Sequence, residues 1–222
     1  MSPDTSKLAE WSKRLYTAVL SDVLDEMGAR EQACRPFVRP LDETSVLCGF
    51  ARTGLYRPVH HIEPGRNPYA IEMALIDDLR PGEVAVLACG GPTDSIAPWG
   101  ELLTTASRVR GAAGCLTDGL VRDVRQIREA GFPVFHGGIG PLDSKGRGEM
   151  AAMDVPVVLA GVRVEPGDLV FGDVDGCVVV PKAILGEVVD RALAKASAED
   201  KTREALLAGE SLSSVFARYG VL

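Results

Sequence analysis

Arg122 and Asp123 are the adjacent residues of this sequence best suited to acid chemistry. They follow a small, apolar segment, residues 111–117, and a break at Asp118-Gly119. A guanidinium can bind an anionic oxygen, and a neighbouring carboxylate can hold a divalent metal ion. Together these groups suit a reaction that builds negative charge on a small organic acid. Because Arg-Asp neighbours also occur at ordinary helix starts, the dipeptide has meaning only with the elements around it.

A second candidate anion site lies upstream, where a helix is predicted to begin at Gly100. Two glycines, Gly90 and Gly91, precede it in a loop that follows an apolar segment. Free amides at a helix N-terminus point toward a ligand, and the helix dipole favours negative charge there. The alternative is a loop that only needs the conformational freedom of glycine. This feature alone does not separate the two interpretations.

The middle of the chain alternates between predicted strands and helices joined by short links. This order indicates parallel pairing with right-handed crossovers. Ligands bind where the carboxyl ends of parallel strands meet, so we expect the amides of residues 100–103 and the Arg122 side chain to converge there. The predicted strands are 83–89, 112–117 and 133–135, and the predicted helices are 100–110 and 124–130.

The flanking parts of the chain are predicted to be helical at both ends, with a second group of strands between. Short strands at 155–159, 162–164, 168–172 and 177–180 indicate antiparallel or mixed pairing. Without a repeat or linker, the chain is predicted to be one α/β domain, residues 1–222, with helical regions at 1–30 and 182–222. Other predicted elements are a helical region 6–28, a strand 46–55, an irregular loop 55–68, a helix 69–79 and a long C-terminal helix stopped by Gly209.

Composition excludes several classes of function. The 222 residues are 46% hydrophobic and 25% charged, as in folded soluble proteins, and the net charge of −7 argues against a nucleic-acid surface. No apolar run reaches the roughly 18 residues that a membrane span needs. Five scattered cysteines without a Cys-x-x-Cys spacing indicate packing roles and a reducing, cytoplasmic location.

Other catalytic arrangements find little support. The three histidines, His60, His61 and His136, lack zinc-site spacing, and each is expected at the surface or in a turn. Cys115 lies in a predicted strand, and Lys182 shows no sign of the desolvated pocket that a Schiff-base lysine requires. The serines, Ser95 and Ser107, lack a Gly-x-Ser-x-Gly context. Oxygen ligands are abundant and favour Mg²⁺ or Mn²⁺; they are Asp22, Glu101, Asp123, Asp173, Asp175 and Glu199.

Four motif blocks together resemble the RraA-like family. That family includes 4-hydroxy-4-methyl-2-oxoglutarate aldolases and regulators of ribonuclease activity. The resemblance covers nearly the whole chain, from residues 21–28 to the C-terminal helix. The blocks are Gly100-Glu-Leu-Leu-x-x-Ala106, Arg110-Gly111-x-x-Gly114, Thr117-Asp118-Gly119-x-Val121-Arg122-Asp123 and Gly172-Asp-x-Asp-Gly176-x-Val-Val-Val-Pro181.

The resemblance implies a compact α/β/β sandwich that forms trimers or hexamers, with active sites between subunits. It implies that Arg122 binds the pyruvate part of a 2-oxo acid and that Asp123 ligates a divalent metal, Mg²⁺ or Mn²⁺. Glu101 falls where the family has an Asp or Glu that holds metal-bound water. The amides of Gly100, Glu101, Leu102 and Leu103 would seat the substrate carboxylate.

Two further acidic residues are expected to come from a neighbouring subunit. Glu199 matches a C-terminal glutamate of the family, here expected near the metal, and Asp22 matches an acidic position in the N-terminal helix. The expected activity is retro-aldol cleavage to pyruvate, with oxaloacetate decarboxylation. The alternatives are a non-catalytic regulator of an RNA-processing enzyme and a related enzyme for another oxo acid. The loop 92–98 and His136 depart from the family pattern.

Overall fold

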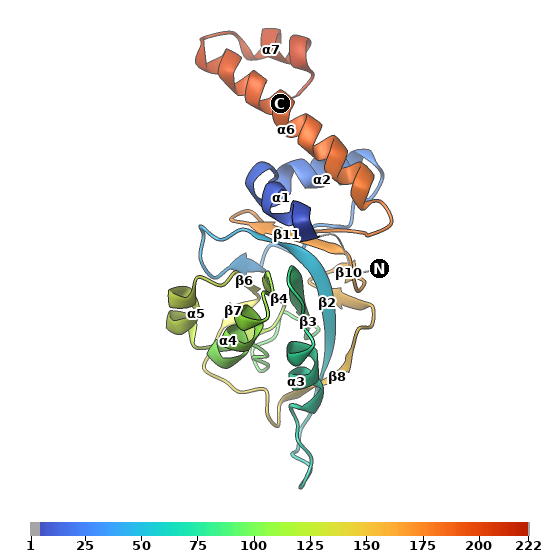
Figure 1. The fold of residues 1–222 in the computed structure, drawn as a ribbon, viewed down its shortest axis with the longest axis vertical. Helices are drawn as coiled ribbons and strands as arrows, with labels where there is room; N and C mark the ends of the chain where they lie inside the picture. Colours follow the sequence, from blue (N-terminus) through green and yellow to red (C-terminus); the bar gives the residue numbers. More distant parts are fainter. Residues whose placement is uncertain (1–4, 222) are drawn as a thin grey trace.

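The computed structural model describes residues 5–221, which form a mixed sheet, helices that flank it and a C-terminal helical arm (Figure 1). The predicted α/β fold class is confirmed. Residues 1–4 and 222 of the predicted terminal helical regions lie outside the described residues. The helices are η1 (Thr5–Lys7), α1 (Leu8–Arg14), α2 (Thr17–Glu26), α3 (Ala70–Asp77), α4 (Glu101–Val109), α5 (Val124–Ala130), α6 (Leu185–Leu207) and α7 (Leu212–Tyr219).

The main sheet of the described chain has the order β1-β6-β4-β3-β2-β11-β12, with β8 also paired to β2. The pairs β2–β3, β3–β4 and β4–β6 are parallel, whereas β11 is antiparallel to both neighbours. The predicted parallel centre and mixed second half are therefore confirmed. The strands are β1 (Arg39–Pro40), β2 (Leu47–Pro58), β3 (Glu83–Ala88), β4 (Gly114–Thr117), β5 (Leu120–Val121), β6 (Val134–His136), β7 (Gly138–Ile139), β8 (Gly148–Met153), β9 (Val157–Leu159), β10 (Val162–Val164), β11 (Leu169–Asp173) and β12 (Gly176–Val180).

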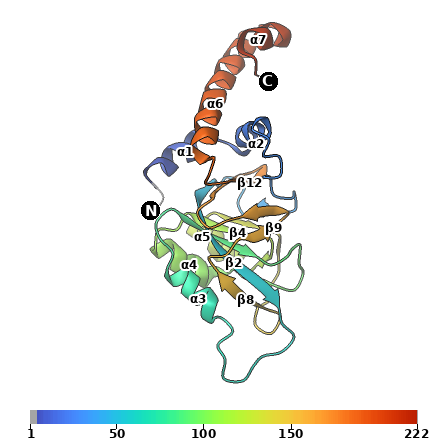
Figure 2. The same ribbon diagram turned by 90° about the vertical axis from the view of Figure 1, so that its right-hand side faces the viewer.

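The parallel centre is buried on both faces, and its middle strand β3 is apolar and buried from Val84 to Ala88. In β3, Val84 and Val86 pack with Leu159 of the β9–β10 hairpin, whereas Ala85 and Leu87 pack with α3 and α5 on the other face. Figure 2 shows α3 and α4 on one side of β2 and β9 on the other. This two-sided burial fixes the register and holds the carboxyl ends of β3 and β4 beside each other.

The helical region predicted over 6–28 is present, but a break that was not predicted divides it into α1 and α2. The helix α1 ends at Arg14, and Tyr16 is extended before α2 begins. The break is stabilised from far along the chain. Asp173 accepts hydrogen bonds from the backbone N–H of Thr17 at 2.8 Å and from its hydroxyl at 2.7 Å. Since the first amides of a helix lack internal acceptors, this carboxylate lets α2 start at Thr17.

The prediction of a loop over 55–68 was wrong for its first residues, because β2 continues to Pro58. Its extension is paired with β8, which was not predicted. The sequence of β8, Gly-Glu-Met-Ala-Ala-Met, contains no β-branched residue and so carries little strand preference. Pairing across a bulge between Leu55 and Tyr56 defines this strand.

The C-terminal arm extends away from the sheet, and α7 folds back at its tip (Figures 1 and 2). The first half of α6 packs through Val188, Ala192 and Ala196 into the core with α2. The helix ends as predicted before Gly209, whose φ of +90° suits glycine. None of the helices in residues 5–221 combines the length and apolar composition that crossing a membrane requires.

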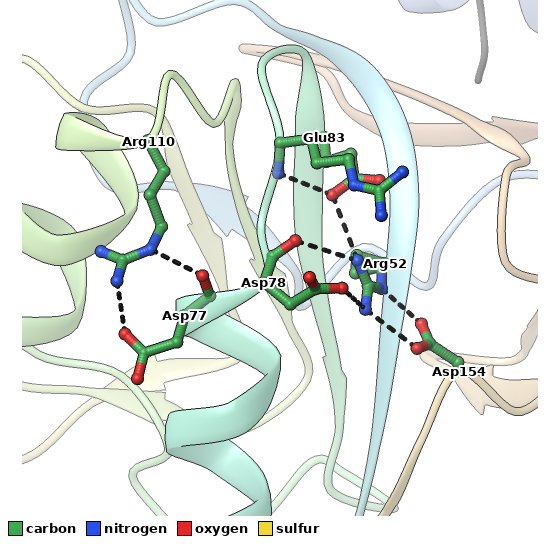
Figure 3. A network of polar contacts seen from close by, with 7 residues as sticks. Arg52, Asp77, Asp78, Glu83, Arg110 and Asp154 are labelled. Carbon is green, nitrogen blue, oxygen red and sulfur yellow. Dashed lines mark hydrogen bonds and ion pairs between the residues drawn. The ribbon is translucent and has the colours of Figure 1, made fainter.

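Ion pairs hold the C-terminal ends of α3 and α4 in place (Figure 3). Arg110, which follows α4, binds the carbonyl of Asp77 at 3.0 Å and also its carboxylate. Arg52 of β2 binds Asp78 Oδ2 at 2.8 Å and Asp154 Oδ2 at 3.0 Å. These contacts join α3 to α4 and to β2. Because a helix is rigid, they also help to position the N-terminal ends of α3 and α4.

Candidate functional site

A cavity of about 290 Å³ opens where α3, the start of α4 and the segment between β5 and α5 meet. The structure thus brings together Arg122, Asp123 and the start of α4, which the strand order led us to expect at one sheet edge. The lining residues are Tyr69, Glu72, Met73, Ala97, Pro98, Trp99, Gly100, Leu102, Leu103, Arg122, Asp123, Asp143 and Ser144.

Asp123 is held in an unusual backbone conformation that directs its carboxylate to α4. It has a φ of 59° and a ψ of 34°, the left-handed region that few residues other than glycine adopt. Its Oδ2 accepts a hydrogen bond from the N–H of Glu101 at 3.1 Å. A Cβ atom on Gly100 would lie 2.7 Å from the same oxygen. Glycine at position 100 therefore leaves the space that the Asp123 carboxylate occupies.

Arg122 lies between two carboxylates and remains open to the cavity. Its Nε is 3.7 Å from Asp123 Oδ2, and its Nη1 is 3.7 Å from Asp143 Oδ1. Nη1 also donates to the carbonyl of Leu142 at 3.4 Å. The Arg122 side chain is 38% exposed, so a ligand can reach the guanidinium. These contacts position the group without enclosing it.

The start of α4 offers further hydrogen-bond donors. In an α-helix the first amides have no internal acceptor, and within residues 5–221 no acceptor is found for the N–H of Leu102 or Leu103. Both residues line the cavity. The Glu101 side chain does not line it, because its Oε1 accepts a hydrogen bond from the Thr105 hydroxyl at 2.7 Å. Glu101 therefore contributes its amide to the site in the single chain.

Three cavity residues that can ionise were not predicted from the sequence: Tyr69, Glu72 and Asp143. The Tyr69 hydroxyl donates to Asp143 Oδ2 at 2.6 Å. Burial opposes ionisation of Asp143, but the hydrogen bonds from Tyr69 and the local backbone, with the charge of Arg122, hold its pKa below the usual range. Helical spacing in the predicted helix 69–79 places Tyr69 and Glu72 on one face. No comparable signal marked Asp143.

Glu72 is a buried carboxyl group that lines the cavity. Only 6% of it is exposed, and burial raises its pKa to about 7. The neighbouring Tyr56 hydroxyl and the charge of Arg122 offset this effect in part, whereas Asp143 adds to it. A carboxyl group with a pKa near neutrality can donate or accept a proton at physiological pH.

Asp22 and Glu199 lie on other elements and do not line this cavity. Asp22, on α2, is 3.0 Å from the Nζ of Lys195. Glu199, on α6, accepts a hydrogen bond from Tyr16. Burial, together with Glu199, raises the pKa of Tyr16. Since both carboxylates were expected to act in a neighbouring subunit's site, their roles stay predictions.

The metal site predicted from Asp123, Glu101 and Glu199 is not assembled within one chain. Across residues 5–221, no three side chains of His, Cys, Asp or Glu lie close enough together to hold a metal ion. The donors at the cavity nevertheless fit a hard cation, since its lining contains carboxylates and neither histidine nor cysteine. Mg²⁺ is commonly held by one or two carboxylates and keeps several waters, so Asp123 would suffice as an anchor.

His136 was expected at the surface or in a turn, and this expectation was wrong. It ends β6 and is 8% exposed, and burial lowers its pKa to about 4. Nδ1 has no hydrogen-bond partner in the described part of the chain. His60 and His61 do lie in an exposed loop, as predicted. The cysteines are all free, and four of the five are buried, in agreement with packing roles.

Residues 17–179 match the family model described as RraA-like, Aldolase/RraA. A protein of Halalkalibacterium halodurans named "Putative 4-hydroxy-4-methyl-2-oxoglutarate aldolase" is 33% identical over 193 residues, which cover 86% of this chain and 84% of that protein. Protein DlpA of Legionella pneumophila is 31% identical over 196 residues. This match covers 88% of the present chain and 31% of DlpA, so the chain spans less than a third of that relative.

Solved structures give the same result. An uncharacterized protein from Pseudomonas syringae superposes with a TM-score of 0.82 and 30% identity, covering 97% of this chain and 99% of that one. RraAS2 of Streptomyces coelicolor, described as an unusual member of the RNase ES inhibitor RraA protein family, has a TM-score of 0.79 and 29% identity over 91% of this chain and 98% of its own. Family model, relatives and fold agree, and the chain belongs to the RraA-like family.

Proposed function

We propose that this protein is a divalent-metal-dependent lyase that cleaves a small 4-hydroxy-2-oxo acid, such as 4-hydroxy-4-methyl-2-oxoglutarate, to pyruvate. One observation carries the proposal: Arg122, Asp123 and the unpaired amides of α4 line a single cavity. Relatives that bear an aldolase name support the reaction class. The same site would decarboxylate oxaloacetate, because both reactions leave negative charge on the pyruvate fragment.

Different residues of the chain would bind different parts of the pyruvate fragment. The amides of Leu102 and Leu103 would bind the substrate carboxylate at the start of α4. The Arg122 guanidinium would bind the carbonyl oxygen, where negative charge develops as the carbon–carbon bond breaks. Because Arg122 is already oriented by Asp123 and Asp143, little rearrangement is needed during the reaction.

Asp123 would hold Mg²⁺ or Mn²⁺, with Glu101 and Glu199 as the further ligands that we propose. When bound, the metal would supply Lewis-acid polarisation of the substrate carbonyl. In the aldol reaction a carboxylate must also take the proton of the substrate hydroxyl. Glu101, Asp22 and Glu199 are the candidates for this role, directly or through a water molecule.

The positions of Asp22 and Glu199 bear on the assembly. Both lie on elements away from the cavity of their own chain, so they can reach a site only from a neighbouring subunit. We therefore propose a homotrimer, or a hexamer built from trimers, with shared active sites. The oligomeric state in solution, measured by light scattering, tests this part of the proposal.

A second candidate function follows from the similarity to RraAS2, a member of an RNase inhibitor family. In that case the protein would bind an RNA-processing enzyme and would have no catalytic activity. The net charge of −7 fits a surface that binds a basic protein partner. Conversely, the donors collected at the cavity have no evident use in such a regulator, and they favour the enzyme.

The decisive test is pyruvate release from oxaloacetate and from 4-hydroxy-4-methyl-2-oxoglutarate. Turnover that requires Mg²⁺ or Mn²⁺ and stops with EDTA would support the lyase. A folded protein that binds no metal and releases no pyruvate from either acid would refute the lyase and favour the regulator.

A further inference from the structure

The charges around the cavity are strongly unequal. Of the described residues that line it, Arg122 is the only cation, whereas three lining residues carry carboxyl groups: Glu72, Asp123 and Asp143. Arg122 is within 3.7 Å of both Asp123 and Asp143. Its charge is therefore already shared between two carboxylates before any substrate binds.

The part of the cavity formed by α3 and residues 143–144 has a different character from the start of α4. Tyr69, Glu72, Asp143 and Ser144 line it, and each carries an oxygen that can accept a hydrogen bond. The Tyr69 hydroxyl fixes the Asp143 carboxylate at 2.6 Å, and Glu72 is fixed by burial. Tyr69 and Glu72 lie at the start of α3, and Asp143 and Ser144 lie in the loop before β8, so two segments distant in the sequence form one surface.

Such a surface suits hydroxyl groups and disfavours a second carboxylate. Hydroxyl groups donate to carboxylates in strong, short hydrogen bonds. A second substrate carboxylate would instead face the ionised Asp143 carboxylate, with the one lining arginine already needed at the pyruvate end. Like charges placed against each other in an interface reduce affinity and exclude the wrong ligand.

We propose that the substrate carries one carboxylate and a neutral, hydroxyl-bearing tail, as in a 3-deoxy-2-oxo sugar acid. Tyr69, Glu72 and Asp143 bind the tail, and Arg122 with the amides of α4 binds the pyruvate end. This inference rests on the proposed lyase function. It separates this chain from the dicarboxylate substrate in the name of its Halalkalibacterium relative.

The reaction on such a substrate is a balanced retro-aldol cleavage. The bond between C3 and C4 breaks, and its electron pair passes to C3 to give the enolate of pyruvate, which takes up a proton to form the methyl group. The C4 hydroxyl loses its proton and becomes the carbonyl of a neutral aldehyde. No oxidant or reductant is needed.

Two five-carbon acids that differ only at C5 test the inference. They are 4,5-dihydroxy-2-oxopentanoate, which ends in a hydroxymethyl group, and 4-hydroxy-2-oxoglutarate, which ends in a carboxylate. With the full-length wild-type protein and Mg²⁺, we expect kcat/KM for the first to be at least about tenfold higher. Equal values, or a preference for the dicarboxylate, would overturn the inference and leave the lyase proposal standing. Pyruvate from neither acid would overturn the inference, and the lyase proposal would fall with it only if oxaloacetate and 4-hydroxy-4-methyl-2-oxoglutarate also release no pyruvate.

The variant Asp143→Asn tests the physical cause. It removes one negative charge from the tail surface and keeps the size of the side chain. We expect the ratio of kcat/KM for the dicarboxylate to that for the hydroxymethyl acid to rise at least about threefold, and this ratio cancels any general loss of activity. Asp190→Asn, an exposed position on α6, is the matched control and should leave the ratio unchanged. An unchanged ratio in Asp143→Asn would contradict the electrostatic argument.

Discussion

Gly100→Ala is the smallest change that should disable the site without affecting the fold. The backbone of Gly100 is extended, with a φ of −156° and a ψ of −172°, so alanine is conformationally allowed there. Its Cβ would lie 2.7 Å from Asp123 Oδ2, 3.2 Å from Arg122 Cγ and 3.3 Å from Arg122 Nε. The first distance is too short for any real contact, so Asp123 must move away from the start of α4.

The expected loss of activity follows from the displacement of Asp123 and Arg122. Asp123 has to shift by several tenths of an ångström or rotate, which breaks its 3.1 Å hydrogen bond from the Glu101 amide and disturbs Arg122. A misplacement of about 1 Å in a catalytic arrangement can cost on the order of 100-fold in rate. We therefore expect pyruvate release to fall by about 100-fold or more. The Asp123 side chain is 40% exposed, so it can relax into solvent, and stability should change by less than about 1 kcal/mol.

The assay is metal-dependent pyruvate release, with thermal unfolding of the same samples. Gly186→Ala is the matched control, because a Cβ at that helical position would meet nothing within 4 Å. It should retain full activity and unfold at the same temperature as the wild type or slightly higher. If Gly100→Ala keeps activity within about threefold of the wild type, the placement of Asp123 and Arg122 as reacting groups is wrong.

Three further predictions concern stability, each measured by urea denaturation. Burial raises the pKa of Glu72 from 4.5 to about 7, so the protonated side chain stabilises the fold fully below pH 4.5, and this stabilisation is lost as the pH rises to 7. Between pH 4 and pH 8 the free energy of unfolding of Glu72→Gln should therefore rise by roughly 3 kcal/mol relative to that of the wild type. A difference between the two proteins that does not change with pH would refute this. Burial lowers the pKa of His136 from 6.5 to about 4, so the neutral ring stabilises the fold above pH 6.5, and this stabilisation is lost as the pH falls toward 4. Between pH 7 and pH 5 the free energy of unfolding of His136→Gln should therefore fall by about 2 kcal/mol less than that of the wild type. Equal decreases in the two proteins would contradict the burial of the neutral ring. Arg52→Met keeps an apolar stem but removes the ion pairs with Asp78 and Asp154. It should lower the free energy of unfolding by about 1–3 kcal/mol. An unchanged free energy of unfolding would show that these ion pairs do not stabilise the fold.

Those parts of the fold that depend on local pattern were predictable from the sequence. The alternation of apolar strands and amphipathic helices between residues 83 and 136 predicted the parallel centre, and β3, β4 and β6 pair as expected. Arg122 and Asp123 were identified because they follow a strand and a turn in that alternation. Their approach to Gly100 followed from the rule that parallel strands end at one edge.

What could not be predicted depends on contacts between distant residues. The break before Thr17 is stabilised by Asp173, 156 positions away. Strand β8 has no intrinsic strand preference and forms because β2 offers it an edge. Asp143 joins the cavity through Tyr69, 74 positions away. Each of these features requires tertiary structure, since the local sequence does not show which distant residue makes the contact.

Arg122 is proposed to stabilise negative charge on a 2-oxo acid, and one comparison of variants tests this role most directly. Metal-dependent pyruvate release should be measured for Arg122→Ala and for Arg125→Ala, which removes the same charge from an exposed neighbour that does not line the cavity. We predict that Arg122→Ala folds normally and loses on the order of 10²–10³ in kcat, whereas Arg125→Ala stays within about twofold of the wild type. If Arg122→Ala remained within about tenfold of the wild type, a charge-stabilising role for Arg122 would be contradicted.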